Sequence, residues 1–275
     1  MQAVIKFLKQ PKLFVFTIMW MMVLVVLGTI AQREMGLFAV QQKYFSAWVT
    51  WVGFLPMPGG RLTMIIMLVN LSFFFFNKSI WQFNKLGIVI LHLGGMLLLI
   101  GGGLTAIFSS EGNMVIKEGS SSNHVEDYHY IELAVVNTSA VNFDEFTIFE
   151  QSALKIGKLL THKNLNFEIE VINYLENCEP VERTSAAEVN YRGMLKNFIL
   201  SELKPEKEDN WNRPGIIYQI SNSGTNKDGI YGIFLGQTIP QTLEMNGHRY
   251  QFYLRRQRTY LPFSIELLDF KKTLH

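Results

Sequence analysis

Residues 85–108 read KLGIVILHLGGMLLLIGGGLTAIF, and this stretch decides what kind of fold the first part of the chain forms. An apolar run of about 22 residues is long enough to cross the hydrocarbon core of a bilayer as one helix. His92 is the one ionisable side chain inside the run. At about 1.5 Å per residue it lies roughly 10 Å from the Lys85 end, too deep for an interfacial anchor. An ionisable residue at that depth indicates a functional site.

The helix expected here has two different faces. At about 100° per residue, His92 shares its face with small and apolar residues, namely Ile88, Gly95, Met96, Leu99 and Gly103. Glycines recur every seventh residue near the opposite side, at Gly87, Gly94 and Gly101. Because glycines let a neighbouring helix approach closely, we expect the glycine face to pack tightly. The His92 face would suit a flat, apolar ligand with a metal at its centre, or His92 only hydrogen-bonds a neighbouring helix.

Charge divides the chain into two parts. Residues 1–108 contain eight Lys and Arg and one acid, Glu34, whereas residues 109–275 contain seventeen Lys and Arg and twenty-two acids. A membrane domain (1–108) followed by a water-soluble domain (109–275) is therefore expected, and neither has the basic excess typical of nucleic-acid binding. Cys178 is the single cysteine, which excludes an intramolecular disulfide, a CxxC redox pair and a CxxCH haem-attachment site in this sequence.

Three transmembrane helices are expected, at about 13–31, 62–76 and 86–108. The first run is longer than the apolar region of a signal peptide, and the preceding lysines favour a cytoplasmic N-terminus. Residues 33–60 form an interfacial segment, where aromatic residues at helical spacing over 45–52 predict a short surface helix. Asn70 and Ser72 are expected to hydrogen-bond between helices. This topology places the second domain outside the cytoplasm.

Residues 109–275 have the pattern of an all-β, antiparallel sandwich or barrel-like domain, with short β-rich runs between turn residues. Alternation of period two is clearest at 167–171 and 249–254. Strands are expected at 114–117, 130–136, 146–149, 154–158, 167–174, 216–221, 230–235, 249–255 and 263–270.

Few other residues have a pattern that indicates chemistry. His124 and His129 flank Glu126 and Asp127, which would allow a metal site, but an ordinary polar loop is the simpler interpretation. There is no recognisable Ser/His/Asp arrangement and no phosphate-binding glycine loop. No catalytic residue is therefore expected in this chain on its own.

Several short motifs resemble the ResB (CcsB) family of system II cytochrome c maturation. These are LGTIAQ at 27–32, KYF at 43–45, LHLG at 91–94, EG at 111–112 and LPFSIELLDF at 261–270. Their order and spacing extend over essentially the whole chain. The resemblance implies a subunit that works with a ResC (CcsA)-type membrane protein in a bacterial cytoplasmic membrane, carries haem b to the outer face, and attaches it to apocytochrome c.

The resemblance also implies residue roles and partners. In the family an intramembrane histidine is an axial ligand of the haem iron, and His92 matches that position, with Gly95, Met96 and Leu99 expected beside the cofactor. Expected partners are the ResC-type protein, apocytochrome c, the lipid bilayer and a thioredoxin-like protein that reduces thiols. Family members have a fourth span after the soluble domain, whereas this sequence has no apolar run after Phe270. A fragment, the front part of a fused ResB–ResC chain and a shortened member all fit.

Two other functions remain open at this point. The chain could be a membrane-anchored scaffold that stabilises a partner membrane protein, with His92 only joining helices. It could also be a transporter subunit in which His92 relays protons.

Overall fold

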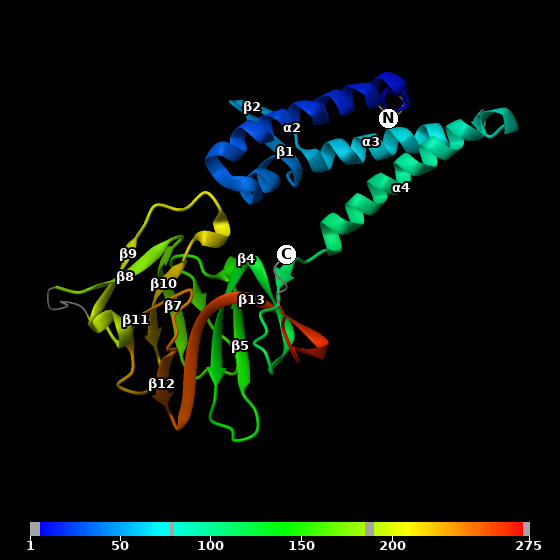
Figure 1. The fold of residues 1–275 in the computed structure, drawn as a ribbon. Coiled ribbons are helices and arrows are strands. Elements are labelled where there is room, and N and C mark those ends of the chain that lie inside the picture. The colour runs from blue at the N-terminus through cyan, green and yellow to red at the C-terminus, as the bar shows by residue number, and fades with distance from the viewer. Residues whose placement is uncertain (1–5, 78–79, 185–189, 272–275) are drawn as a thin grey trace. The chain divides into compact units, whose positions relative to one another are not determined.

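The computed structural model describes residues 6–77, 80–184 and 190–271. The chain forms two compact units, a helical unit of residues 1–110 with 207–209, and a β unit of residues 111–206 with 210–275 (Figure 1). The division expected from charge, at residue 108, therefore falls within two residues of the boundary between the units.

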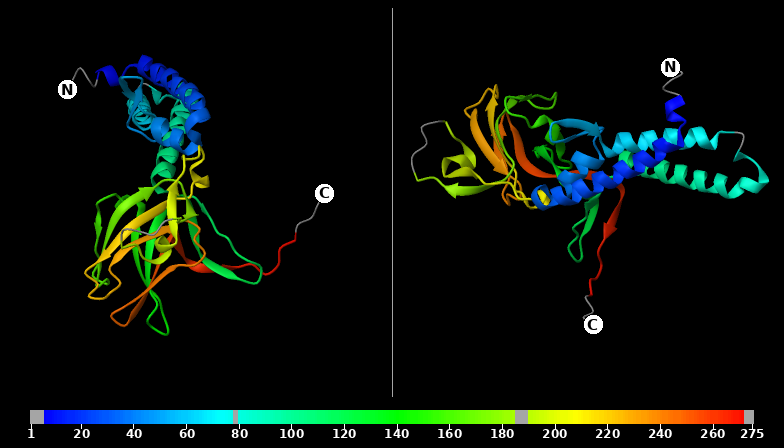
Figure 2. Two further views of the ribbon diagram at one scale, coloured as in Figure 1. Left: turned by 90° about the vertical axis from the view of Figure 1, so that its left-hand side faces the viewer. Right: turned by 90° about the horizontal axis from the view of Figure 1, so that it is seen from above.

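Within residues 6–77 and 80–110, the helical unit contains α2 (Pro11–Val40), the π-helical turn η1 (Gln41–Phe45), α3 (Gly60–Phe75), the 3-10 turn η3 (Phe83–Lys85) and α4 (Leu86–Phe108). α3 packs against both α2 and α4 (Figures 1 and 2). α2 changes direction at Gly36, whose φ of 73° and ψ of 168° are not helical.

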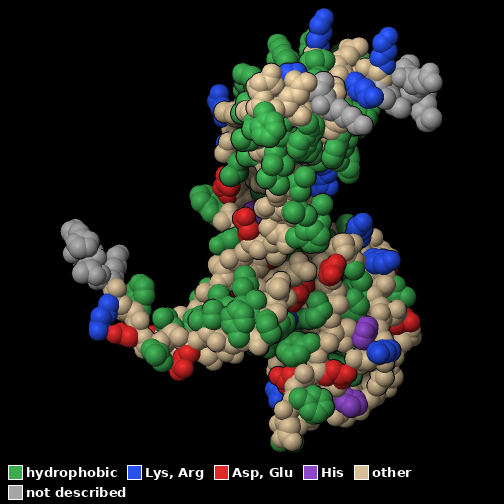
Figure 3. Space-filling view, turned by 90° about the vertical axis from the view of Figure 1, so that its right-hand side faces the viewer, with side chains coloured by type: hydrophobic (Ala, Val, Ile, Leu, Met, Phe, Trp, Pro, Cys, Tyr) green, Lys and Arg blue, Asp and Glu red, His purple; other side chains and the backbone are tan. Residues whose placement is uncertain are grey.

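Two of these helices are long and apolar enough to cross a bilayer, Pro11–Phe45 and Phe83–Phe108. α3 is shorter, with 16 residues, than the about 20 residues that a span usually needs. The face of the helical unit seen in the upper part of Figure 3 carries many hydrophobic side chains. Only 17% and 6% of the most apolar windows of the two long helices are buried. Apolar side chains left exposed over such a length indicate a lipid or protein environment around them.

The prediction of an interfacial helix over 45–52 is wrong, because residues 49–52 form the first strand of a β-hairpin. β1 (Val49–Val52) pairs antiparallel with β2 (Leu55–Pro58) through the two-residue loop Gly53-Phe54. Gly53 has a φ of +63°, which suits the first position of such a loop. Pro56 and Pro58 cannot continue a helix, so the glycine and the prolines favour the hairpin over the helical spacing of the aromatic residues.

The polar residues of α3 differ in what they bind. Asn70 is buried, and its side-chain amide donates to the backbone oxygens of Leu8 (2.6 Å) and Gln10 (3.0 Å), so it joins α3 to the N-terminal segment. Ser72 donates to the carbonyl of Leu68 in its own helix, at 2.7 Å. The expected contact between elements is therefore confirmed for Asn70 and wrong for Ser72.

Two antiparallel sheets make up most of the β unit. One contains β11 (Gly229–Phe234), β10 (Gly215–Ser221), β7 (Glu168–Leu175) and β6 (Leu159–Leu160) in spatial order. The other contains β12 (Gln241–Met245), β13 (His248–Glu266), β4 (Ser121–Asn137) and β3 (Gly112–Asn113), with β5 (Glu145–Glu150) also paired to β4. A separate hairpin joins β8 (Cys178–Glu182) to β9 (Phe198–Glu202). The described residues of the unit also form the 3-10 turns η4 (Gln151–Ala153) and η5 (Gly193–Lys196), and a third turn, η6 (Asp209–Trp211), begins at the last residue assigned to the helical unit.

One hydrophobic core joins the two sheets. Leu133 of β4, Ile169 of β7, Tyr218 of β10 and Phe252 of β13 belong to the same buried cluster, and the Tyr218 and Phe252 rings stack at 5.6 Å between centroids. Two antiparallel sheets around one core are the arrangement of a β-sandwich. The all-β expectation for this part of the chain is therefore confirmed.

The expected strands differ from the observed ones in several places, and three observed strands, β8, β9 and β12, were not expected at all. Residues 114–117 and 154–158 are not strands, and the paired residues lie next to them, in β3 and β6. Residues 249–255 and 263–270 belong to one long strand, β13, up to Glu266. The polar loop expected around His124 and His129 is wrong, since both lie in β4. The first part of β4 escaped recognition because it pairs as a partly exposed arm with β13, without an alternating apolar face.

Cys178 is buried in a smaller hydrophobic cluster with Leu175, Leu195 and Leu200. Burial raises the pKa of its thiol to about 11, against a weaker opposing effect of the Arg213 charge. Because the thiolate is the reactive form, this thiol is inert near neutral pH. Its place in the core agrees with a small packing residue rather than a redox centre.

Candidate functional site

His92 lies in the first half of α4, at a position where its ring is fixed by the helix itself. Its Nδ1 is 2.8 Å from the carbonyl oxygen of Ile88, one turn earlier. A carbonyl only accepts hydrogen bonds, so Nδ1 carries the proton in the neutral ring. Nε2 then keeps its lone pair, which is the form in which histidine binds a metal.

An apolar groove of about 380 Å³ contains His92. All three helices contribute to its walls: Pro11, Phe14 and Val15 from α2, Asn70, Leu71 and Phe74 from α3, and Leu91, His92 and Gly95 from α4. The Phe74 ring is tilted against the His92 ring, with 6.1 Å between their centroids. The volume of the groove is at the small end of the roughly 300–1,000 Å³ typical of ligand pockets.

The four residues expected around a cofactor do not all line this groove. His92 and Gly95 lie together in it, whereas Leu99 lines a second apolar groove of about 510 Å³ between α2 and α3. Met96 is partly buried on the same face of α4 and is not among the residues that line either groove. Of the four residues, only His92 and Gly95 therefore share a groove.

Sequence reasoning missed the contributions of α2 and α3 to the groove. Asn70 and Phe74 are four residues apart and so share one face of α3, a spacing that is visible in the sequence. No pattern in the sequence, however, shows that this face meets His92.

The prediction of which face of α4 packs tightly is wrong. An added Cβ would meet no atom within 4 Å at Gly87, Gly94 or Gly101, whereas at Gly95 it would lie 3.1 Å from Leu71 Cδ2. The His92 face therefore packs on α3, and the heptad glycine face is open. Helical spacing identifies faces, but it does not say which of them a neighbouring helix of the same chain will cover.

Gly95→Leu is expected to destabilise the helical unit by about 1–3 kcal/mol, because overfilling a packed interface displaces neighbouring side chains. Leu71, which the new side chain would meet, is buried and has little room to move. Gly94→Leu is the matched control, since the space around Gly94 is open. Thermal melting of the full chain in detergent compares the two variants. Equal shifts in melting temperature would contradict the packing described above.

The residues that line the groove are compatible in chemistry with the haem that the resemblance implies. Its walls are mostly apolar, and its one polar side chain besides His92, Asn70, is engaged with backbone carbonyls. A neutral imidazole is a common axial ligand of haem iron, and an apolar surround suits a porphyrin. His92 would hold the iron, while Phe74 and Leu91 would border the macrocycle.

The acidic and histidine residues of β4 form no comparable centre. His124 Nε2 is 3.9 Å from Glu126 Oε1, but that oxygen also accepts bonds from Arg258. Asp127 accepts the backbone N–H groups of His129 and Tyr130. Burial and the nearby Arg258 charge lower the pKa of His124. Among the residues described, no three His, Cys, Asp or Glu side chains gather as a metal site would require.

Comparisons with known proteins add no family assignment. No family model matches the chain, and no curated protein matches it.

Proposed function

We propose that this chain is the ResB-type subunit of a membrane complex that delivers haem and attaches it to apocytochrome c. The observation that carries the proposal is the state of His92: its Nδ1 is bonded within the helix, its Nε2 is left with a lone pair, and its ring lines an apolar groove. The proposed reaction and the proposed partner rest on the motifs that resemble those of ResB.

In this proposal α2, α3 and α4 cross the bacterial cytoplasmic membrane and the β unit lies outside the cytoplasm. His92 supplies one axial ligand to haem b held in transit, and a histidine of a ResC-type partner supplies the other. The chain has no catalytic group of its own in this scheme. It binds and orients the cofactor, and the partner completes the attachment site.

The open glycine face of α4 is consistent with a partner helix in the membrane. Gly87, Gly94 and Gly101 repeat along that face, and each has free space where a Cβ would be. Glycine repeats let helix backbones approach closely in lipid. The chain can therefore pack on its own α3 through the His92 face and on another protein through the glycine face.

Deleting the chain from its host tests the function directly. We expect c-type cytochromes to lose covalently bound haem while proteins that bind haem b without a covalent bond keep theirs. The measurement is haem staining of membrane proteins after denaturing electrophoresis, with reduced-minus-oxidised spectra for total haem b. Restoration by the intact gene is the control.

The alternatives give different results in the same experiment. A scaffold with a structural His92 would be rescued by His92→Ala as well as by the wild type, because partner abundance would recover. A proton-relaying transporter subunit would leave covalent haem unchanged on deletion. Either result would overturn the delivery proposal.

A further inference from the structure

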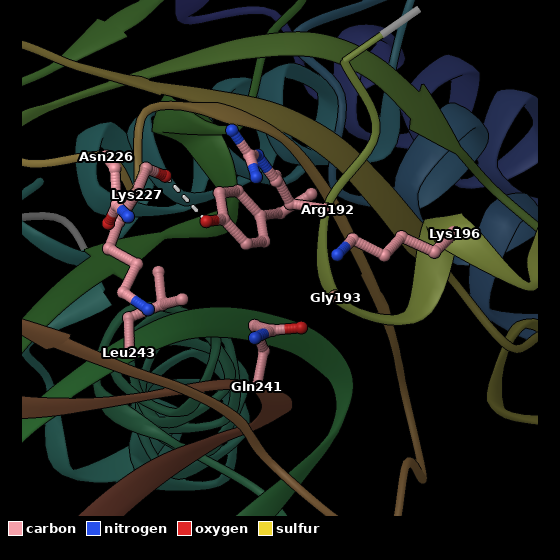
Figure 4. A pocket seen from close by; sticks show the side chains of 8 residues that line it. Arg192, Gly193, Lys196, Asn226, Lys227, Gln241 and Leu243 are labelled. Carbon is pink, nitrogen blue, oxygen red and sulfur yellow. Dashed lines mark hydrogen bonds between the residues drawn. The ribbon is translucent and has the colours of Figure 1, made fainter. Parts of the chain in front are cut away.

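A pocket unrelated to the two apolar grooves lies in the β unit. It is a small pocket of about 170 Å³ with mostly polar walls (Figure 4). Three of its lining side chains are cationic, Arg192, Lys196 and Lys227, and Asn226 and Gln241 add side-chain amides. These residues come from three separate segments of the sequence, and no local pattern predicted the pocket.

Three separate segments bring the cations together. Arg192 and Lys196 flank and end η5, Lys227 lies in the turn between β10 and β11, and Gln241 begins β12. In Figure 4 the Lys196 and Lys227 side chains extend from opposite sides of the opening. The pocket is thus formed by the tertiary fold and not by one flexible loop.

Two glycines allow the Arg192 and Gln241 side chains to lie directly against the backbone of neighbouring segments. A Cβ at Gly229 would lie 2.6 Å from Arg192 Cγ, so the arginine stem rests directly on that backbone. A Cβ at Gly193 would lie 1.9 Å from Gln241 Oε1, and Gly193 has a φ of +55°. Larger residues at either glycine would displace Arg192 or Gln241 from the pocket wall.

The positive charge of the pocket is not neutralised by the residues described. Within 6–77, 80–184 and 190–271, none of the three cations has an ion pair, and the Nε of Arg192 is buried without a hydrogen-bond partner. Asp228, next to Lys227 in the chain, instead accepts hydrogen bonds from the backbone and hydroxyl of Ser223. Buried donors are normally paired, so the Nε–H of Arg192 is available to donate to an acceptor in the pocket.

We infer that this pocket binds a phosphate group. The planar guanidinium of Arg192 can donate to two oxygens of one oxyanion, and Lys196 and Lys227 add point charges. Three cations favour a group with more than one negative charge over a single carboxylate. The small volume admits one such group and excludes a nucleotide base in the same pocket. The phosphate can be inorganic or part of a larger molecule that remains outside.

Calorimetric titration of the full chain in detergent tests the inference, with inorganic phosphate, glycerol 3-phosphate and acetate as probes at constant ionic strength. We expect saturable binding of phosphate and at least tenfold weaker binding of acetate. Stronger binding of glycerol 3-phosphate than of phosphate would identify a phosphate ester as the ligand class; the reverse order would identify the free ion.

Lys196→Gln/Lys227→Gln is expected to weaken phosphate binding at least tenfold. Both side chains are exposed, so their loss leaves the core intact. Lys158→Gln/Lys163→Gln removes the same charge from exposed sites that do not line the pocket and should bind as the wild type does. Absence of saturable phosphate binding, equal affinity for acetate, or equal losses in the two double variants would each overturn the inference.

Discussion

If the proposed function holds, His92→Ala is expected to remove most haem, and with it the Soret absorbance, from a complex purified with a ResC-type protein. In that proposal the variant loses an axial ligand that the methyl group of alanine cannot replace. Added imidazole should restore haem content, because a free imidazole can occupy the space left by the side chain and supply the same nitrogen. The measurement is the absorbance spectrum of the purified complex, wild type beside variant, normalised to protein.

The matched control is His248→Ala, which removes an exposed imidazole at the start of β13 in the β unit. Its spectrum should equal that of the wild type. Equal haem and an identical spectrum in His92→Ala would make His92 a structural residue. Loss of haem that imidazole does not restore, accompanied by loss of the partner, would favour the scaffold function.

A hydrogen bond within α4 orients the His92 ring. The Ile88 carbonyl holds Nδ1 at 2.8 Å, and this contact needs no partner protein. The ring is therefore oriented before any ligand arrives, which lowers the entropic cost of binding. The Phe74 ring beside it also restricts the directions from which a ligand can reach Nε2.

The sequence was most informative where one physical signal dominated. The expected third span, 86–108, coincides with α4, since an unbroken apolar run ends in polar residues on both sides. Strong alternation likewise predicted β7 and the first half of β13. The interfacial segment was misassigned because two signals competed there. The Gly53 turn and the prolines outweighed the helical spacing of the aromatic residues.

The sites were harder to predict because they depend on which surfaces meet. Helical spacing predicted which residues of α4 share a face with His92. That this face packs on α3 depends on Leu71 and Phe74 of α3, and spacing within α4 cannot show it. The basic pocket gave no signal, since Arg192, Lys227 and Gln241 converge only after the sheets have formed. Local patterns therefore specified the elements, and contacts between distant residues specified the sites.

Glu132→Ala is expected to be the most destabilising of the charge changes in the β unit. Arg255 and Glu132 are partners across β13 and β4, with Arg255 Nε 2.8 Å from Glu132 Oε1, and their side chains are only 13% and 4% exposed. Removing one member of a buried pair leaves the other charge uncompensated, which costs about 3–5 kcal/mol.

Glu126→Ala provides a control of the same chemistry on the same two strands. Arg258 and Glu126 also face each other across β13 and β4, at 2.8 Å, but their side chains are 28% and 30% exposed. Water can solvate the remaining arginine, so the loss should not exceed about 1 kcal/mol. The two ion pairs thus have the same N···O distance and differ mainly in how far their side chains are buried.

Hydrogen exchange of the full chain in detergent, followed by mass spectrometry of peptides from β4 and β13, measures both losses. A loss of about 3 kcal/mol corresponds to exchange roughly 100-fold faster for amides that open with the sheet, and a loss of about 1 kcal/mol to roughly fivefold. Similar acceleration in the two variants would show that water reaches Arg255 as readily as Arg258. In that case the long arm formed by β4 and β13 would open as one unit, and the burial of Glu132 would contribute little to holding the two strands together.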